Sequence, residues 1–249
     1  AARYLEECLS GMRNLGIDYD AASEHGIVLC GTPSAGMPTA DLTFGLMLAL
    51  ARQIPHEDKR VRTGEWQETI GIGLPGRTLG ILGLGRLGER VAKIARAFEM
   101  NVIAWSQNLT QERCDEVGAT LVNKLELMRQ SDFLTIHLVL SERTQGLIGA
   151  SDLEAMKPTA FLINTSRGPI VDEEALAIIL QNNAIAGAGL DVFRSEPLPS
   201  SHIFRTLSNT VVTPHLGYVE QSNYESYFKG YRDAIRGYLD GKPVNVLND

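Results

Sequence analysis

The stretch Thr78-Leu79-Gly80-Ile81-Leu82-Gly83-Leu84-Gly85-Arg86-Leu87-Gly88 decides the fold of this chain. Its first five residues form an apolar run that predicts a strand. Apolar residues then recur at helical spacing on one face, at Leu87, Val91, Ile94 and Phe98. A glycine-rich turn between a strand and a helix is typical of a dinucleotide-binding unit, and the pattern predicts such a unit here.

Each glycine of this turn has a physical reason. Gly83 permits a tight bend, Gly85 lets a pyrophosphate approach the backbone, and Gly88 allows the helix to pack closely on the sheet. The backbone N–H groups of Arg86 and Leu87 lie at the predicted helix N-terminus, where they can bind phosphates. We therefore expect these five residues to bind a dinucleotide cofactor.

The rest of the chain extends this unit into a larger sheet. Apolar runs with strand character lie at 79–82, 102–105, 120–122, 133–138, 160–164, 185–191 and 211–213, with helical patterns between several of them. This alternation predicts an α/β fold with a doubly wound parallel sheet of the Rossmann type. Pro38 and Thr39 open an apolar helix, whose polar continuation at 54–66 should leave the core, and 220–239 is predicted to be an amphipathic helix.

The composition limits the classes of function. The 249 residues are 44% hydrophobic, which indicates a globular chain with a sizeable core, and the net charge of −7 argues against a general nucleic-acid surface. The longest apolar stretch, 42–51, is shorter than the roughly 20 residues that span a bilayer, so no membrane segment is predicted. The three cysteines are widely spaced, and we expect neither a disulfide framework nor a metal site. A cytoplasmic location fits best.

Three turn-like segments after predicted strands each place one ionisable side chain. The segments 164–168, 190–197 and 213–217 carry Arg167, Glu196 and His215. An arginine can hold a carboxylate through charge-assisted hydrogen bonds, and a protonated histidine beside a carboxylate can deliver a proton. Each residue alone would more often be structural. The three together predict a site that binds a 2-oxo acid and protonates its carbonyl oxygen.

The second predicted strand departs from the usual fingerprint of an NAD site. It is followed by Ser106, Gln107 and Asn108, where a carboxylate usually binds the ribose hydroxyls. Without that carboxylate the 2′-phosphate of NADP is not repelled. Ser106 and Gln107 could donate hydrogen bonds to the phosphate, and Arg113 could supply charge. The sequence leaves NAD and NADP open and favours NADP.

The ordered motifs make the chain resemble the D-isomer-specific 2-hydroxyacid dehydrogenases, the family of phosphoglycerate dehydrogenase and the glyoxylate/hydroxypyruvate reductases. The motifs lie at 83–88, 132–137, 164–168, 190–197 and 213–217. The resemblance implies hydride transfer between NAD(P)H and a small 2-oxo or D-2-hydroxy acid, chiefly as a reductase.

The resemblance also implies roles for individual residues. Arg167 would contact the substrate carboxylate and carbonyl, His215 would donate and accept the proton, and Glu196 would hydrogen-bond the histidine. Asp191 would bind the nicotinamide carboxamide. The same end of the cofactor would be lined by Thr165, Ser166, Leu216 and Gly217.

A division into domains follows from the resemblance. Residues 1–36 and 218–249 would form a partial, flavodoxin-like substrate domain, and 37–217 the NAD(P)-binding domain. Gly11 and Met12 resemble a loop whose backbone binds the substrate carboxylate. Family members are typically longer at the N-terminus. The segment 39–66 matches an arm that helps to form a two-fold dimer, so we expect a homodimer.

Two other readings stay open at this point. The chain could be a non-catalytic dinucleotide sensor or interaction protein, like the corepressors that resemble this family. It could also be a truncated, inactive fragment that binds the cofactor only. Turnover of glyoxylate or hydroxypyruvate would separate an enzyme from both.

The remaining histidines have different expected places. His25, His56 and His202 stand in polar surroundings and are predicted to be surface groups. His137 ends a predicted strand on the cofactor side. We expect it to line the site without a catalytic role.

Overall fold

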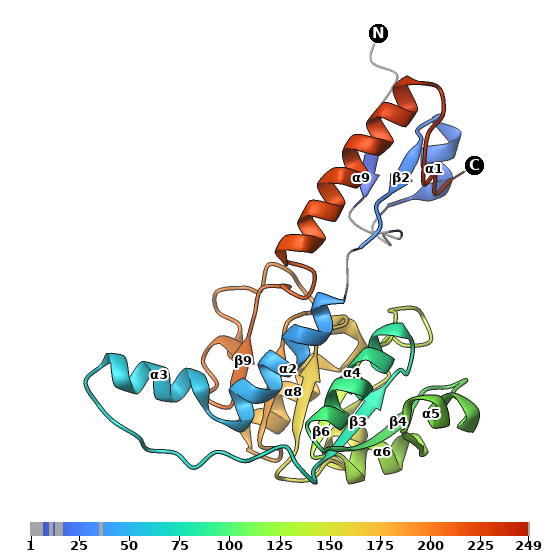
Figure 1. Ribbon diagram of the computed structural model, residues 1–249. Coiled ribbons are helices and arrows are strands. Elements are labelled where there is room, and N and C mark those ends of the chain that lie inside the picture. Colours follow the sequence, from blue (N-terminus) through green and yellow to red (C-terminus); the bar gives the residue numbers. More distant parts are fainter. Residues whose placement is uncertain (1–6, 10–11, 13–16, 35–36, 249) are drawn as a thin grey trace. The chain divides into compact units, whose positions relative to one another are not determined.

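The computed structural model describes residues 7–9, 12, 17–34 and 37–248 (Figure 1). The chain divides into two compact units, residues 1–38 with 218–249 and residues 39–217. The sequence places the first boundary two residues earlier, at residue 36. Among the helices within the described ranges, none has the length and apolar character needed to cross a membrane.

The larger unit is built on a seven-stranded sheet in which all neighbouring strands are parallel. The strand order is β5-β4-β3-β6-β7-β8-β9. The chain adds strands on one side of β3 and then, from β6 onward, on the other side, so the topological switch lies between β3 and β6. This arrangement confirms the predicted doubly wound fold. The strands are β3 (Thr78–Leu82), β4 (Asn101–Trp105), β5 (Thr120–Leu121), β6 (Phe133–Ile136), β7 (Phe161–Asn164), β8 (Gly187–Leu190) and β9 (Thr210–Val212).

Helices cover both faces of this sheet (Figure 1). One face packs against α2 (Pro38–Ala51), α4 (Arg86–Ala97) and α5 (Gln111–Val117). The other packs against α6 (Lys124–Gln130), α7 (Ala150–Glu154), α8 (Glu173–Gln181) and the short 3₁₀ helices η1 (Gly168–Ile170) and η2 (Ile203–Arg205). Successive strand residues point to opposite faces, so Ile81 joins the first core and Leu82 the second. Strands that are buried on both faces therefore read as continuous apolar runs.

Strand β6 ends two residues before the end of its apolar run. The run at 133–138 predicts a strand over its whole length, but β6 ends at Ile136. Residues 137–140 beyond it belong to no strand, and the carbonyl of Leu138 instead accepts a hydrogen bond from the hydroxyl of Ser166. Apolar residues that line a buried loop and those of a buried strand give the same pattern.

The predicted continuation of α2 is a separate helix, α3 (Ile54–Arg62). The break falls at Gln53, which adopts a left-handed conformation with φ of 52°, just before Pro55. Proline lacks an N–H and its ring crowds the preceding turn, so one continuous helix cannot pass through this point. The helix also ends before residue 66, at Arg62.

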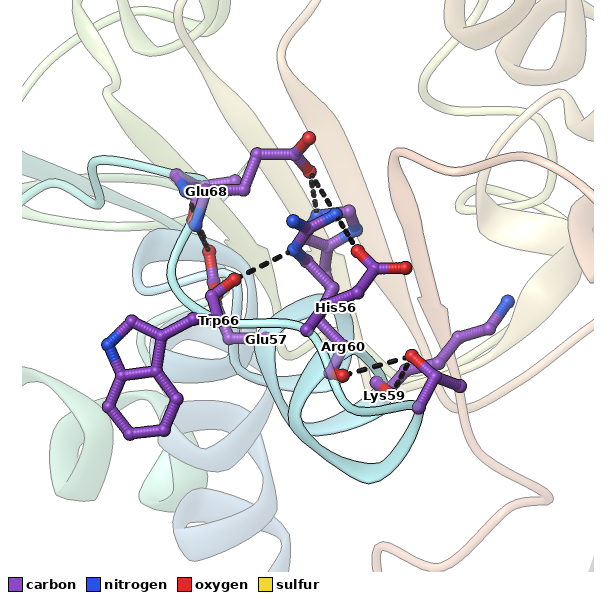
Figure 2. Close-up of polar contacts among 9 residues, drawn as sticks. His56, Glu57, Lys59, Arg60, Trp66 and Glu68 are labelled. Carbon is purple, nitrogen blue, oxygen red and sulfur yellow. Dashed lines mark hydrogen bonds and ion pairs between the residues drawn. The ribbon is translucent and has the colours of Figure 1, made fainter.

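The segment of α3 and the following loop stands apart from the sheet (Figure 1), and no residue of α3 is buried. Polar contacts fold the loop back onto the helix (Figure 2). The carboxylate of Glu57 accepts a hydrogen bond of 2.7 Å from the backbone N–H of Thr69. Nε2 of His56 lies 2.7 Å from Oε2 of Glu68, and Nη1 of Arg60 lies 3.2 Å from the same oxygen. The segment is therefore held together by polar contacts rather than by a core of its own.

The smaller unit pairs β1 (Glu7–Leu9) with β2 (Leu29–Gly31) in parallel, and it contains α1 (Tyr19–Glu24) and α9 (Gln221–Leu239). The helix predicted at 220–239 is present, with Glu220 as its N-cap. The carboxylate of Glu220 accepts from the backbone N–H groups of Ser222 and Asn223, as acceptors at N-caps do.

Candidate active site

The three residues predicted to act in catalysis follow three neighbouring strands. Arg167 follows β7, Glu196 follows β8 and His215 follows β9. The carboxyl ends of parallel strands meet at one edge of the sheet, which is where ligands bind in open α/β folds. The glycine-rich turn follows β3 at the same edge. The sheet topology thus gathers groups that are far apart in the sequence.

His215 and Glu196 form a close pair. Nδ1 of the histidine lies 2.6 Å from Oε2 of the carboxylate, and the two side chains are 35% and 34% exposed. The other carboxylate oxygen accepts a hydrogen bond of 2.9 Å from the backbone N–H of Phe193. Because this bond fixes the carboxylate, it also orients the imidazole ring. Because Nδ1 takes part in this pair, any proton exchange between the ring and a ligand would use Nε2.

The turn that carries His215 is shaped by Asp191, which is fully buried. Oδ1 of Asp191 accepts hydrogen bonds from the hydroxyl of Thr213 at 2.6 Å and from the backbone N–H of Leu216 at 2.7 Å, and Oδ2 accepts from Gly217 at 2.8 Å. His215 itself has a φ of 56°, a conformation uncommon for a residue other than glycine. These three bonds hold it there. The sequence assigns Asp191 to the nicotinamide and gives no sign of this second role.

The turn after β7 is organised by Asn164, a residue that the sequence did not single out as functional. Its Oδ1 accepts from the backbone N–H of Ser166, and its Nδ2 donates to the carbonyl of Arg167, both at 3.0 Å. Nη1 of the exposed Arg167 donates to the carbonyl of Ser166 at 2.6 Å. The sequence signal for this role is an asparagine at the end of a predicted strand, directly before Thr165-Ser166-Arg167-Gly168. The Asn164 side chain fixes the backbone from which the guanidinium of Arg167 projects.

The side chains of Thr165 and Ser166 are both used within the protein. The hydroxyl of Thr165 lies 3.0 Å from that of Thr43 on α2, and Ser166 donates to the carbonyl of Leu138. Gly217 is likewise buried, and its carbonyl accepts a hydrogen bond of 2.8 Å from Thr39. Any contact of these residues with a cofactor would therefore use their backbone or the remaining faces of their side chains.

The glycine-rich turn has the geometry that a pyrophosphate needs. Gly83 has a φ of 102°, and a Cβ on Gly88 would lie 2.2 Å from the carbonyl oxygen of Gly83, so neither position accepts a side chain. A Cβ on Gly85 would meet nothing within 4 Å, so that face of the turn is open. Helix α4 begins at Arg86 without a side-chain cap, which leaves its first N–H groups, including that of Leu87, directed at this open face.

His137 lies beside this turn, because a Cβ on Gly83 would come within 2.7 Å of the His137 carbonyl oxygen. Nε2 of the ring lies 3.0 Å from the hydroxyl of Thr135. Nδ1 is buried and has no hydrogen-bond partner among the described residues. Burial lowers the pKa of His137 to about 3, so the ring is neutral. A buried nitrogen without a partner fits a site in which a bound molecule completes the hydrogen bonding.

The loop after β4 holds the residues predicted to select between NAD and NADP. Ser106 is half-buried and Gln107 is exposed. The guanidinium of Arg113 lies 2.5 Å from Glu89 and 2.6 Å from Glu116, so its charge is already compensated. The pKa of Glu89 is held at about 2 by its hydrogen bonds from Lys93 and Arg113. Arg113 is therefore a weaker candidate for a phosphate than its sequence position predicts.

Two substrate-binding residues, Gly11 and Met12, are predicted in the smaller unit. Gly11 lies outside the described residues. Met12 is described, and its side chain is half-exposed. Within the described residues, no group of three or more histidine, cysteine, aspartate or glutamate side chains could hold a metal ion.

A cavity of about 530 Å³ opens beside His215 and Glu196. Its wall is mostly apolar, with one guanidinium, that of Arg205. The other lining residues are Phe193, Pro197, Leu198, Val212, Thr213 and Pro214. A cavity of this size can hold a small molecule against the imidazole.

Comparisons with known proteins identify the family of the chain. Residues 44–217, more than half of the chain, match the family model described as D-isomer specific 2-hydroxyacid dehydrogenase, NAD binding domain. The chain is 40% identical over 243 residues to a glyoxylate reductase of Thermococcus litoralis, covering 93% of this chain and 73% of that protein. It is also 40% identical over 231 residues to a D-3-phosphoglycerate dehydrogenase of Synechocystis sp., covering 92% of this chain and 42% of that protein.

A solved structure gives the same result. The phosphoglycerate oxidoreductase of Vibrio cholerae O395 superposes with a TM-score of 0.88 and 32% identity, covering 93% of this chain and 76% of that one. The chain therefore belongs to the D-isomer specific 2-hydroxyacid dehydrogenase family, and its larger unit contains the NAD-binding domain of that family. The family, the fold and the class of enzyme, an NAD(P)-dependent oxidoreductase, are as the sequence predicted.

Proposed function

We propose that this protein transfers a hydride between NAD(P)H and a small 2-oxo acid, with reduction as its main direction. The observation that carries the proposal is the 2.6 Å contact between His215 and Glu196 at the sheet edge that also carries Arg167. The alternative of a non-catalytic sensor needs no such orientation of an imidazole.

The chemistry follows from these three groups. A bound nicotinamide dinucleotide would supply a hydride for C2 of the 2-oxo acid, and negative charge would then develop on the carbonyl oxygen. Protonated His215 delivers a proton from Nε2 to that oxygen, so the product is the 2-hydroxy acid. Glu196 stabilises the charged ring through Nδ1. Arg167 holds the substrate carboxylate and stabilises the developing oxyanion, because its charge cannot be lost.

We propose that the turn Gly83, Gly85 and Gly88, with the N–H groups of Arg86 and Leu87, binds the pyrophosphate. Thr165, Ser166, Asp191 and Gly217 then lie towards the nicotinamide. The absence of a carboxylate at Ser106 favours NADPH over NADH, with Ser106 and Gln107 as donors to the 2′-phosphate. Ser106→Asp should raise the KM for NADPH at least tenfold and leave that for NADH nearly unchanged. An equal change for both cofactors would contradict this assignment.

The substrate class is supported by the relatives, which are named as a glyoxylate reductase and a D-3-phosphoglycerate dehydrogenase. We propose a small 2-oxo acid of the glyoxylate or hydroxypyruvate kind, whose carboxylate is held by Arg167. Initial rates over a panel of small 2-oxo acids, with NADH and NADPH side by side, test this. Cofactor binding without turnover of any acid in the panel would favour a sensor instead.

We also propose a cytoplasmic homodimer. Apolar side chains are exposed on α3 and its loop: Ile54 by 52%, Val61 by 53%, Trp66 by 77% and Ile70 by 93%. In Figure 2 the ring of Trp66 points away from the polar contacts that fold the loop. Exposed apolar groups on a segment without a core are typical of an interface. The buried thiol of Cys114 suits a reducing compartment.

Light scattering tests the dimer. Trp66→Ser combined with Ile70→Ser should shift the protein towards the monomer at micromolar concentration, because both changes remove apolar area from the interface. Glu65→Gln, on the same loop, serves as a control and should leave the mass unchanged. A wild-type protein that is monomeric at all concentrations would rule out the proposal.

A further inference from the structure

The segment 194–202, which carries Glu196, is closed at its base by one carboxylate. Glu173, in the first turn of α8, accepts a hydrogen bond of 2.9 Å from the backbone N–H of Arg194 through Oε2. Its other oxygen, Oε1, lies 3.3 Å from Nε2 of His202. The Glu173 side chain is 16% exposed and that of His202 is 21% exposed. A single side chain thus holds both ends of the segment.

His202 is anchored on its other side as well. Its Nδ1 accepts a hydrogen bond of 3.4 Å from the backbone N–H of Phe204, and the two rings pack with centroids 4.8 Å apart. Phe204 is 2% exposed and belongs to the core. With Nδ1 as the acceptor, the ring proton lies on Nε2, the nitrogen that is 3.3 Å from Oε1 of Glu173. The sequence-based prediction that His202 is a surface group was therefore wrong, because its partner lies 29 positions away in the sequence.

Glu173 also stands next to the turn that carries Arg167. Gly168, which follows Arg167, packs directly against the backbone after β8, since an added Cβ would come within 2.1 Å of the carbonyl carbon of Phe193. The N–H of the same Phe193 donates to Glu196. The backbone that holds the guanidinium and the backbone that holds the carboxylate are therefore in direct contact, and Glu173 ties the next residue, Arg194, to α8.

We propose that Glu173 is a positioning residue for the Glu196–His215 pair, with His202 as its second anchor. The inference rests on the proposed reductase function for its effect on rate, but the geometry that it concerns can be observed without turnover. Removing the Glu173 carboxylate frees the N–H of Arg194 and the ring of His202. The base of the segment then relaxes, and Glu196 no longer holds Nδ1 of His215 at 2.6 Å.

The neighbouring Glu174 separates this role from a general effect of acidic residues at a helix start. Both carboxylates lie in the first turn of α8, where each is favourable to the helix dipole. The Glu174 side chain is 86% exposed and pairs at 3.5 Å with the exposed side chain of Arg194. Glu174→Ala therefore removes the same charge from the same turn without opening the segment.

The Glu173 and Glu174 variants are compared by steady-state kinetics, with a 2-oxo acid that the wild-type protein reduces. Glu173→Ala should lower kcat about tenfold, because the backbone N–H of Arg194 loses its charged acceptor, and leave the KM for the cofactor within twofold. Glu173→Gln should fall in between, because the amide has one accepting oxygen, whereas the carboxylate places Oε2 at Arg194 and Oε1 at His202. Glu174→Ala should keep kcat within twofold. Equal loss in Glu173→Ala and Glu174→Ala would overturn the proposal.

A spectroscopic readout makes the test independent of activity. In protein labelled with ¹⁵N-histidine, the Nδ1–H proton of His215 should resonate at low field, since it lies in a short hydrogen bond to a carboxylate. The resonance should weaken or move upfield in Glu173→Ala, as in Glu196→Gln, and persist in Glu174→Ala. A wild-type protein without turnover would refute the reductase function alone, whereas an unchanged resonance in Glu173→Ala would refute the positioning role.

A milder variant covers the case in which Glu173→Ala does not fold. His202→Phe keeps a ring against Phe204 and removes the 3.3 Å contact of Nε2 with Glu173, together with the hydrogen bond that Nδ1 accepts from the N–H of Phe204. It should move the His215 resonance in the same direction and lower kcat by about threefold, since one of the two anchors remains. Wild-type kinetics together with a wild-type resonance in this variant would count against the proposal.

Discussion

Replacing Glu196 by glutamine tests the catalytic pair with almost no change in shape. In the wild type, one carboxylate oxygen accepts from the N–H of Phe193 at 2.9 Å and the other from Nδ1 of His215 at 2.6 Å. A glutamine has a single oxygen. If that oxygen stays on Phe193, the amide N–H₂ faces Nδ1 and opposes the doubly protonated ring that the reaction needs. If the amide turns around, the bond to Phe193 is lost and the ring orientation with it.

The expected loss of kcat/KM follows from the hydrogen bond between Glu196 and His215. A hydrogen bond to a charged group contributes about 1.5–3 kcal/mol, and here both side chains are about one third exposed, so the lower half of that range applies. A loss of about 1.5–2 kcal/mol in the transition state lowers kcat/KM by about 10- to 30-fold. Cofactor affinity should not change, because Glu196 lies after β8 and the glycine turn lies after β3.

Initial-rate measurements with a reduced 2-oxo acid give kcat/KM for wild type and Glu196→Gln, and cofactor fluorescence gives the dissociation constant. Glu174→Gln, an exposed carboxylate-to-amide change, serves as the matched control and should behave as wild type. A loss of less than twofold in Glu196→Gln would refute the view that this carboxylate orients and stabilises the imidazolium. A parallel loss of cofactor binding would show that the change had disturbed the fold.

Two further predictions concern stability and the cofactor turn. Gly88→Ala should lower the melting temperature and weaken cofactor binding, because its Cβ would lie 2.2 Å from the Gly83 carbonyl oxygen. Gly149→Ala is the control and should do neither, since its Cβ would meet nothing within 4 Å. Equal effects of the two substitutions would contradict the packing argument. The depressed pKa of His137, about 3, means that the unfolded chain takes up a proton below about pH 6.5 before the folded protein does. Folding stability should therefore be intact above that pH and fall between pH 6.5 and 3, by up to about 1.4 kcal/mol per pH unit from this group. In denaturant titrations His137→Asn should remove that part of the slope, and an unchanged slope would contradict a buried neutral ring.

The sequence predicted the elements whose signal is local. The strand, glycine turn and helix at 78–97 appear as predicted, because Gly83 and Gly88 leave no room for a side chain and Gly85 keeps one face of the turn open. The catalytic trio could be predicted for a related reason. Each of its members directly follows an apolar run, and the carboxyl ends of parallel strands lie at one edge of the sheet.

Other features depend on contacts between distant segments, which no local pattern encodes. The bend at Gln53 needs a left-handed residue that a helical pattern does not reveal, although Pro55 gave a hint. The contact between Glu173 and His202 joins two segments whose sequences are those of an ordinary polar surface. The three hydrogen bonds of Asp191 to the turn of His215 were likewise not predicted, because a buried carboxylate at the end of a strand can serve either a ligand or a loop.

The most direct test of the central claim is the single-turnover rate of hydride transfer to glyoxylate or hydroxypyruvate in wild type and in His215→Ala, followed by the absorbance of the nicotinamide. We expect turnover in the wild type and a loss of at least several hundredfold in the variant, with cofactor affinity unchanged, because the proton donor is gone. A variant that reduces the same acid at the wild-type rate would contradict the assignment of His215 as the acid.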